Sequence, residues 1–253
     1  PYNIEVVYRW DAAQSYSSLS EVQLVPVEFD AVQPMMAALR DVWFKPYIQA
    51  TGNSLDFLKE VAPKKIVLVG SPEYQNGSFK LGQAEGGRKI LLLNVNNFDA
   101  SNENELKEAL HTIVHEFTHI LHQTKLFNQE YQTISTGRYN SNWTLLNDSE
   151  ARHQGFITNY AMLNKDEDFA EMVSGILVFG YEWFKDTVLA EAAKSTENPH
   201  AKADLEAKLA IVNSYFKETW NIEFFDNETS GEPGLESYFR MAIEEVVSNP
   251  PTK

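Results

Sequence analysis

Residues 101–125 carry the strongest helical pattern in the chain, and this pattern limits which side chains can act together. Apolar residues recur at helical spacing and form one stripe, which consists of Leu106, Leu110, Ile113, Phe117 and Ile120. His115 and His119 are four residues apart, so they share a face of the helix opposite this stripe. We therefore expect a helix with a buried back and two imidazoles in front.

The five residues from His115 to His119 read His-Glu-Phe-Thr-His and match the motif H-E-x-x-H. Two imidazoles on one helical face can bind the same metal ion. Glu116 lies beside such an ion and can accept a proton from a water molecule there. The motif predicts a metal-dependent hydrolase in which Glu116 is the general base. The alternative interpretation is a solvent-exposed histidine face without a metal.

Two further histidines, His111 and His122, lie on the same helical face. His122 follows His115 by seven residues, or about 10 Å along the helix axis, so these two cannot share an ion with His119. We expect structural or cleft-lining roles for His111 and His122.

The composition restricts both the metal ligands and the partners. The chain has no cysteine, so a metal must be held by histidine, aspartate or glutamate. It has 21 basic and 36 acidic residues, a formal net charge of −15. Such a surface repels nucleic acid and anionic membranes, so we expect neither as a partner.

A catalytic zinc ion has three protein ligands, so the motif needs a third from elsewhere in the chain. Glu167 and Glu171 are four residues apart at the start of a helical segment at about 167–190. The opposite face of that segment is apolar and carries Phe169, Val173, Ile176 and Phe184. Acids in a first turn also complement the helix dipole, but this does not account for Glu171. We expect Glu167 to bind the metal, Glu171 to accept an N–H from a ligand histidine, and Asp168 to be a capping or surface acid.

The remaining patterns predict an α+β fold. We expect strands at 3–9 and 65–70, a hairpin of Ser78–Leu81 with Lys89–Val95 around Gly86-Gly87, an irregular stretch at 126–160 with a short helix near 148–158, and further helices at 30–50, 201–218 and 234–247. The strand Lys89–Val95 is expected to form a cleft edge that binds an extended peptide by strand addition.

The spacing of the acidic residues resembles that of known metallopeptidases. H-E-x-x-H followed by a distant glutamate resembles the gluzincins, such as the thermolysin-like peptidases. Tyr160, with Glu167 seven residues later in the sequence Glu-Asp-Phe-Ala-Glu, resembles the catalytic domain of anthrax lethal factor more closely. This resemblance implies that Glu167 binds zinc and that Tyr160 stabilises the oxyanion.

Most of the chain resembles a family of zinc-binding metallopeptidases described as substrate-import-associated zinc metallohydrolase lipoproteins. The matching stretches are Pro1–Val6, Leu81–Gly87, His115–Lys125 and Gly155–Glu171. The patterns along the chain predict a small mixed α/β N-terminal lobe at 1–100 and a helical lobe at 101–253 that carries the metal site. Together with the resemblance they imply a single zincin-like catalytic domain over residues 1–253. The resemblance also implies an extracytoplasmic lipoprotein of the outer membrane or cell surface, associated with a glycan import system. The anchor segment would lie outside this chain.

The function that the sequence favours is a zinc-dependent hydrolase with one Zn²⁺ per chain, a metallopeptidase acting on peptide or glycopeptide bonds. One alternative is a non-catalytic, zinc-containing surface lipoprotein that binds glycans or peptides; the general base Glu116 argues against it. Another is a zinc amidase that acts on amino sugars or cell-wall peptides, which the sequence does not separate from a peptidase. Tyr131, Tyr139 and Trp143 could stack on sugars or serve as packing residues.

Overall fold

The computed structural model describes residues 2–9, 24–75, 78–80, 82–85 and 89–251. The chain divides into two compact units, one of Pro1–Ile120 with Met241–Lys253 and the other of Leu121–Arg240. Strands and helices are both present, so the expected mixed α+β class is confirmed. The expectation of a single catalytic domain with lobes at 1–100 and 101–253 stays a prediction.

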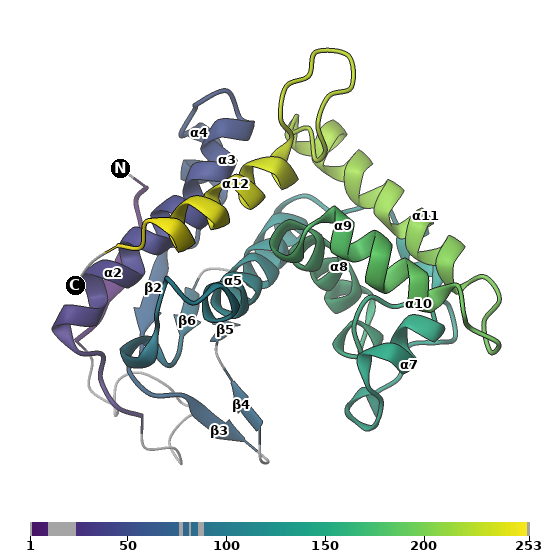
Figure 1. Ribbon diagram of the computed structural model, residues 1–253, viewed down its shortest axis with the longest axis horizontal. Helices are drawn as coiled ribbons and strands as arrows, with labels where there is room; N and C mark the ends of the chain where they lie inside the picture. The colour runs from purple at the N-terminus through teal and green to yellow at the C-terminus, as the bar shows by residue number, and fades with distance from the viewer. Residues whose placement is uncertain (1, 10–23, 76–77, 81, 86–88, 252–253) are drawn as a thin grey trace. The chain divides into compact units, whose positions relative to one another are not determined.

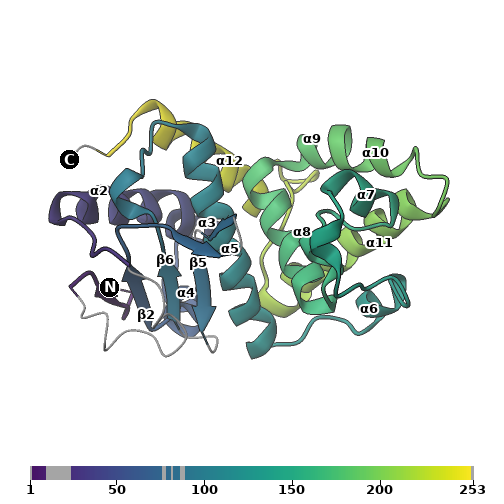
Figure 2. The same cartoon turned by 90° about the horizontal axis from the view of Figure 1, so that it is seen from below.

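The first unit contains a four-stranded sheet with the order β1-β2-β6-β5. The strands β1 (Glu5–Val7), β2 (Lys65–Leu68) and β6 (Lys89–Leu92) are parallel, and β5 (Gly82–Glu85) is antiparallel to β6. Figure 2 shows β2, β6 and β5 side by side. The apolar residues of β2 and β6 are at most 3% exposed, as is typical of parallel strands covered on both faces.

The predicted hairpin pairs the wrong strand with β6. The partner of β6 is β5, whereas β4 (Ser78–Lys80) pairs with β3 (Glu73–Gln75) in a separate two-stranded sheet. The expected turn at Gly86-Gly87 lies outside the described residues. Because β6 has a neighbouring strand on each side, the expected strand addition at Lys89–Val95 is also wrong.

The expected helix at 30–50 is present as three consecutive segments: α2 (Phe29–Leu39), the π-helical turn η1 (Arg40–Phe44) and α3 (Lys45–Ala50), followed by the short helix α4 (Asp56–Val61). Pro46 has no N–H to donate to the carbonyl four residues earlier, and the π-helical turn lies at this point. Figure 1 shows α2 and α3 as one helical run beside β2.

The short turn η2 (Val95–Asn97) leads towards α5 (Glu103–Thr124), which confirms the expected long helix. The five residues of its apolar stripe are all buried, at 6% exposure or less. Phe117 is the centre of an aromatic cluster, with ring centroids 5.4 Å from Trp43, 5.1 Å from Tyr47 and 6.3 Å from Phe57. This packing holds the apolar face of α5 against the helical segment α2–α3.

The second unit is helical in its described residues. In chain order it contains α6 (Glu130–Ile134), η3 (Trp143–Leu145), α7 (Asp148–His153), η4 (Tyr160–Met162), α8 (Lys165–Phe179), α9 (Tyr181–Trp183), η5 (Phe184–Leu189), α10 (Ala190–Ala192), α11 (Ala201–Ser214) and η6 (Tyr215–Thr219), and α12 (Leu235–Ser248) begins in this unit. The expected short helix near 148–158 is α7, whereas α6 is absent from the prediction. The expected helix at 167–190 is interrupted at Gly180, whose φ of +92° is favourable for glycine.

Helix α8 is buried from Asp168 to Val178, and its first turn contains a buried ion pair. Asp168 Oδ2 lies 2.7 Å from Lys208 Nζ on α11, and both side chains are 0% exposed. The expectation that Asp168 is a capping or surface acid is therefore wrong. Figure 1 shows α8 and α11 side by side. The ion pair joins these two helices at the turn that carries Glu167.

Polar contacts surround this ion pair. Lys208 also donates to the Gly155 carbonyl at 2.8 Å, and the Tyr139 hydroxyl donates to Asp168 Oδ2 at 3.1 Å. Burial raises the pKa of Asp168 and lowers the pKa of Lys208, and the attraction between the two groups opposes both shifts. Each charge therefore depends on its partner, because a lone charge in this place would be both buried and unpaired.

Within the part of the chain that the structure describes, no helix is both long enough and apolar enough to cross a membrane.

Replacing Lys208 with methionine should destabilise the protein strongly. The substitution preserves much of the side-chain volume but leaves the Asp168 carboxylate buried without its cation, a loss of about 3–5 kcal/mol. Lys202→Met is the matched control on the same helix, because Lys202 is 51% exposed and pairs with Glu206 at 3.7 Å. We expect the control to change the free energy of unfolding by about 1 kcal/mol or less. Urea unfolding measures both, and equal losses would contradict the importance of the buried pair.

Candidate metal centre

The two motif histidines on α5 converge on one point. Their Nε2 atoms are 3.1 Å apart, with ring centroids 4.7 Å apart and the ring planes at 80°. Two tetrahedral Zn–N bonds of about 2.0–2.1 Å place their nitrogens about 3.3 Å apart. His115 and His119 therefore have the separation of two nitrogens bound to one ion.

The packing of α5 fixes this orientation. Phe117 lies between the two histidines in sequence and is buried in the aromatic cluster on the opposite side. Thr118 is also fully buried, and its hydroxyl donates to the Val114 carbonyl at 2.7 Å. With these neighbours held inside, the helix has little freedom to rotate about its axis.

Glu167 lies in the first turn of α8, which has a well-defined N-cap. The Asn164 side chain accepts hydrogen bonds from the backbone N–H groups of Asp166 at 2.8 Å and of Glu167 at 3.1 Å. This cap satisfies two N–H groups that the helix itself cannot satisfy. The backbone of Glu167 is thus fixed by the cap on one side and by the ion pair of Asp168 on the other.

His115, His119 and Glu167 form a group that could hold a metal ion. Each offers one ligand atom, and these atoms all lie within 4.8 Å of one another. Two neutral imidazoles and one carboxylate are a ligand set of catalytic zinc, in which further positions are left for water and substrate. The residues present therefore fit zinc, and His111, His122, Asp168 and Glu171 are not part of the group. The individual ligand roles stay predictions.

The two predicted catalytic side chains are both partly exposed. Glu116 follows His115 on α5, and Tyr160 opens the turn η4. The Tyr160 ring packs edge-on against Trp143 of η3, with centroids 4.9 Å apart. The catalytic roles of both residues stay predictions.

Glu171 is a buried acid, 4% exposed, on α8. Its Oε2 accepts a hydrogen bond of 2.6 Å from the hydroxyl of Thr158. Thr158 was not among the residues expected from the sequence. No periodicity joins residues 158 and 171, because the chain between them turns through η4 before α8 begins.

Two of the three aromatic residues considered for sugar stacking are packing residues. Tyr131 is 0% exposed and donates to the Asp168 carbonyl at 3.0 Å, and Tyr139 donates to the carboxylate of the same residue. Trp143, the third of these residues, is partly exposed and packs against the ring of Tyr160. His122 is 4% exposed and packs edge-on against Phe127 and Phe169, which agrees with a structural role.

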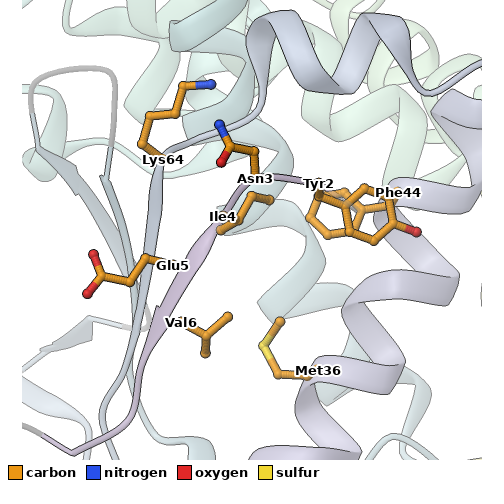
Figure 3. Close-up of a pocket in the computed structure, with 8 residues that line it drawn as sticks. All are labelled: Tyr2, Asn3, Ile4, Glu5, Val6, Met36, Phe44 and Lys64. Atoms are coloured by element: carbon orange, nitrogen blue, oxygen red, sulfur yellow. The ribbon is translucent and has the colours of Figure 1, made fainter.

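A cavity of about 540 Å³ lies elsewhere in the first unit, as Figure 3 shows. Residues of the β1 segment line it together with Met36, Phe44 and Lys64. None of the predicted site residues is among its lining residues, so this cavity is distinct from the candidate metal centre.

Comparison with known proteins gives two matches. Residues 1–225 match the family described as "Putative zinc-binding metallo-peptidase". The crystal structure of a "putative zinc-binding metallo-peptidase" from Bacteroides caccae shares 30% sequence identity with the chain at a TM-score of 0.76, and the match covers 98% of this chain and 88% of that one. No curated protein sequence matches the chain.

Loss of one motif imidazole should abolish stoichiometric metal binding. The wild-type chain should hold one zinc ion, and His119→Ala should hold none after desalting, because two ligands give a much weaker site than three. His111→Ala is the matched control on the same helix, since His111 lies outside the candidate group. Elemental analysis of the zinc-loaded proteins measures both. A full equivalent of zinc on His119→Ala would refute the ligand assignment.

The two glutamates of α8 should differ in their effect on zinc affinity. A carboxylate that touches the metal attracts the cation directly. A carboxylate that only hydrogen-bonds to a ligand histidine acts indirectly, and its loss typically weakens metal affinity by roughly 10–100-fold. Glu167→Ala should therefore weaken zinc binding more than Glu171→Ala does. Competition with a fluorescent chelator gives both dissociation constants. The reverse order would assign the ligand to Glu171.

Proposed function

This chain belongs to the family of zinc-binding metallopeptidases, and from this premise we propose that it is a zinc-dependent hydrolase that cleaves peptide or glycopeptide bonds. The observation that carries the proposal is the candidate ligand group of His115, His119 and Glu167. Glu116 supports it, because a site that only stores or senses zinc has no need of a general base next to its ligands.

The fold that we propose is zincin-like. The sheet of the first unit and the helix α5 that bears the motif support this architecture. The single catalytic domain over residues 1–253 is part of the same proposal.

In the proposed reaction, the residues of the chain bind, orient and transfer protons. Zinc, when bound, supplies a Lewis acid that polarises the scissile carbonyl and makes water more acidic. His115, His119 and Glu167 hold it. Glu116 accepts the proton of the attacking water and delivers it to the leaving amine, which could not otherwise depart as a neutral group.

Tyr160 has a different task in this proposal. Its hydroxyl donates a hydrogen bond to the former carbonyl oxygen as negative charge develops there. A single donor of this kind typically contributes about 10²–10³-fold to the rate. The edge contact with Trp143 restricts the tyrosine ring and so lowers the cost of aligning this donor.

The cellular setting is a separate part of the proposal. An extracytoplasmic place on the outer membrane or cell surface, a lipid anchor outside this chain and an association with glycan import rest on the family resemblance alone. They stay predictions.

Glu116→Gln should separate metal binding from catalysis. The amide has the shape of the acid but accepts no proton, so hydrolysis should fall by roughly 10²–10⁴-fold while zinc binding is unchanged. Glu108→Gln is the matched control, an exposed glutamate two turns earlier on α5. The assay is cleavage of a quenched-fluorescent peptide library and a parallel glycopeptide set, with and without chelator. Equal loss of zinc and activity in Glu116→Gln would make Glu116 a ligand.

The same assay distinguishes the alternative functions. A wild-type protein that binds zinc but cleaves none of the probes, with or without added zinc, would contradict the peptidase proposal. Retention of uncleaved glycopeptide would then indicate a binding module. Release of acetate from acetylated amino sugars would indicate an amidase.

A further inference from the structure

The environment of Glu171 includes a contact that the proposed mechanism does not use. Glu171 is 4% exposed, and a carboxylate in that position needs hydrogen-bond donors. The Thr158 hydroxyl supplies one at 2.6 Å from Oε2. This distance is in the range of charge-assisted O–H···O⁻ bonds, which are about twice as strong as neutral ones.

The same hydroxyl oxygen has a second partner. It accepts a hydrogen bond of 3.2 Å from the backbone N–H of Ala161, the second residue of η4. A hydroxyl has one proton to donate and lone pairs to accept with, so it can make both bonds at once. Thr158 thereby connects the Glu171 carboxylate to the turn that begins at Tyr160.

Further contacts hold the other side of this turn. The Asn159 side chain donates to the Leu146 carbonyl at 2.8 Å, and the Asn159 N–H donates to Asp148 Oδ1 at 2.9 Å. Trp143 packs on the ring of Tyr160. The turn is thus tied to α7 on one side and to α8 through Thr158 on the other.

An ordinary local turn explains only part of this arrangement. Threonine hydroxyls often accept from a backbone N–H three residues later, as Thr158 does from Ala161. Such a turn leaves the hydroxyl proton free to point to water. Here the proton is directed at a buried carboxylate 13 residues away in sequence, on helix α8.

We propose that Thr158 is a positioning residue that fixes the Glu171 carboxylate and the Tyr160 turn relative to one another. The inference rests on the proposed function, in which Glu171 orients a ligand histidine and Tyr160 donates to the oxyanion. The 2.6 Å bond from Thr158 to Oε2 holds the Glu171 carboxylate in one orientation, in which it would accept the N–H of a ligand imidazole. One hydroxyl then sets the position of an outer metal-site partner and of a catalytic donor together.

Thr158→Val tests this, because it removes the hydroxyl and keeps the shape. We expect zinc affinity to fall about tenfold, at the low end of the range for the loss of a group that orients a metal ligand. Thr158→Ser keeps the hydroxyl and should restore most of the affinity. In the peptidase assay, Thr158→Val should lower kcat more than it raises KM, because the substrate is bound by other groups.

Thr51→Val is the control for the loss of a partly buried hydroxyl. Thr51 donates to the Tyr47 carbonyl at 2.8 Å, in the first unit and outside the candidate ligand group. Thermal unfolding of the metal-free proteins should show comparable losses for the two valine variants. Zinc affinity should fall only in Thr158→Val. Similar zinc affinities in both variants would overturn the inference.

A double-mutant cycle shows whether Thr158 acts through Glu171. If it does, Thr158→Val combined with Glu171→Ala should bind zinc as Glu171→Ala alone does, so the two effects are not additive. Additive losses would overturn the inference. These zinc measurements do not depend on turnover, so a wild-type protein that binds zinc and cleaves nothing would defeat the proposed function and leave the cycle decisive. A wild-type protein that binds no zinc would overturn both.

Discussion

The burial of Phe117 determines which way α5 faces, and the metal centre depends on it. Successive helical residues are about 100° apart, so Phe117 projects on the side opposite His115 and His119, two positions away in either direction. Its ring contacts Trp43 and Tyr47, and burying such a side chain contributes about 1.5–3 kcal/mol. The apolar back of the helix thus holds the two imidazoles side by side in front.

The second unit orients its acidic residues by a different means, through buried polar contacts. An ion pair such as Asp168–Lys208 stabilises a fold less than its distance suggests, because both charges lose their hydration. The pair nevertheless restricts the positions of the two helices, because Lys208 must reach both Asp168 and the Gly155 carbonyl. A purely apolar contact would tolerate sliding of α8 along α11. The pair therefore fixes the position along α11 of the first turn of α8, which carries Glu167.

Features that arise from local spacing could be predicted from the sequence. The apolar period of α5 and the four-residue interval of its histidines depend only on helix geometry, and both are present as expected. The predicted hairpin is wrong because Ser78–Lys80 and Gly82–Glu85 are adjacent segments of similar length. Local sequence does not show which of the two pairs with Lys89–Leu92. The burial of Asp168 is not predictable from the sequence for a related reason. Its partner Lys208 is 40 residues later, and nothing in either local pattern marks a lysine for complete burial.

Contacts between short elements are also not predictable from the sequence. Thr158 lies in a stretch without periodicity, and its bond to Glu171 exists only because η4 folds back onto α8. The complete burial of Tyr131 is likewise not predictable from its stretch, which is rich in polar residues. Sequence thus indicated the ligand candidates, whereas the groups that hold them became visible only in three dimensions.

The complete burial of Lys208 also gives the protein a built-in chemical probe of its own dynamics. An amine at 0% exposure, bonded to a carboxylate and a carbonyl, reaches an acylating reagent only while the packing of α8 and α11 is open. Exposed lysines such as Lys202 react from the closed state. The ratio of the two labelling rates, followed by peptide mass spectrometry, therefore reports the free energy of local opening around the turn that carries Glu167.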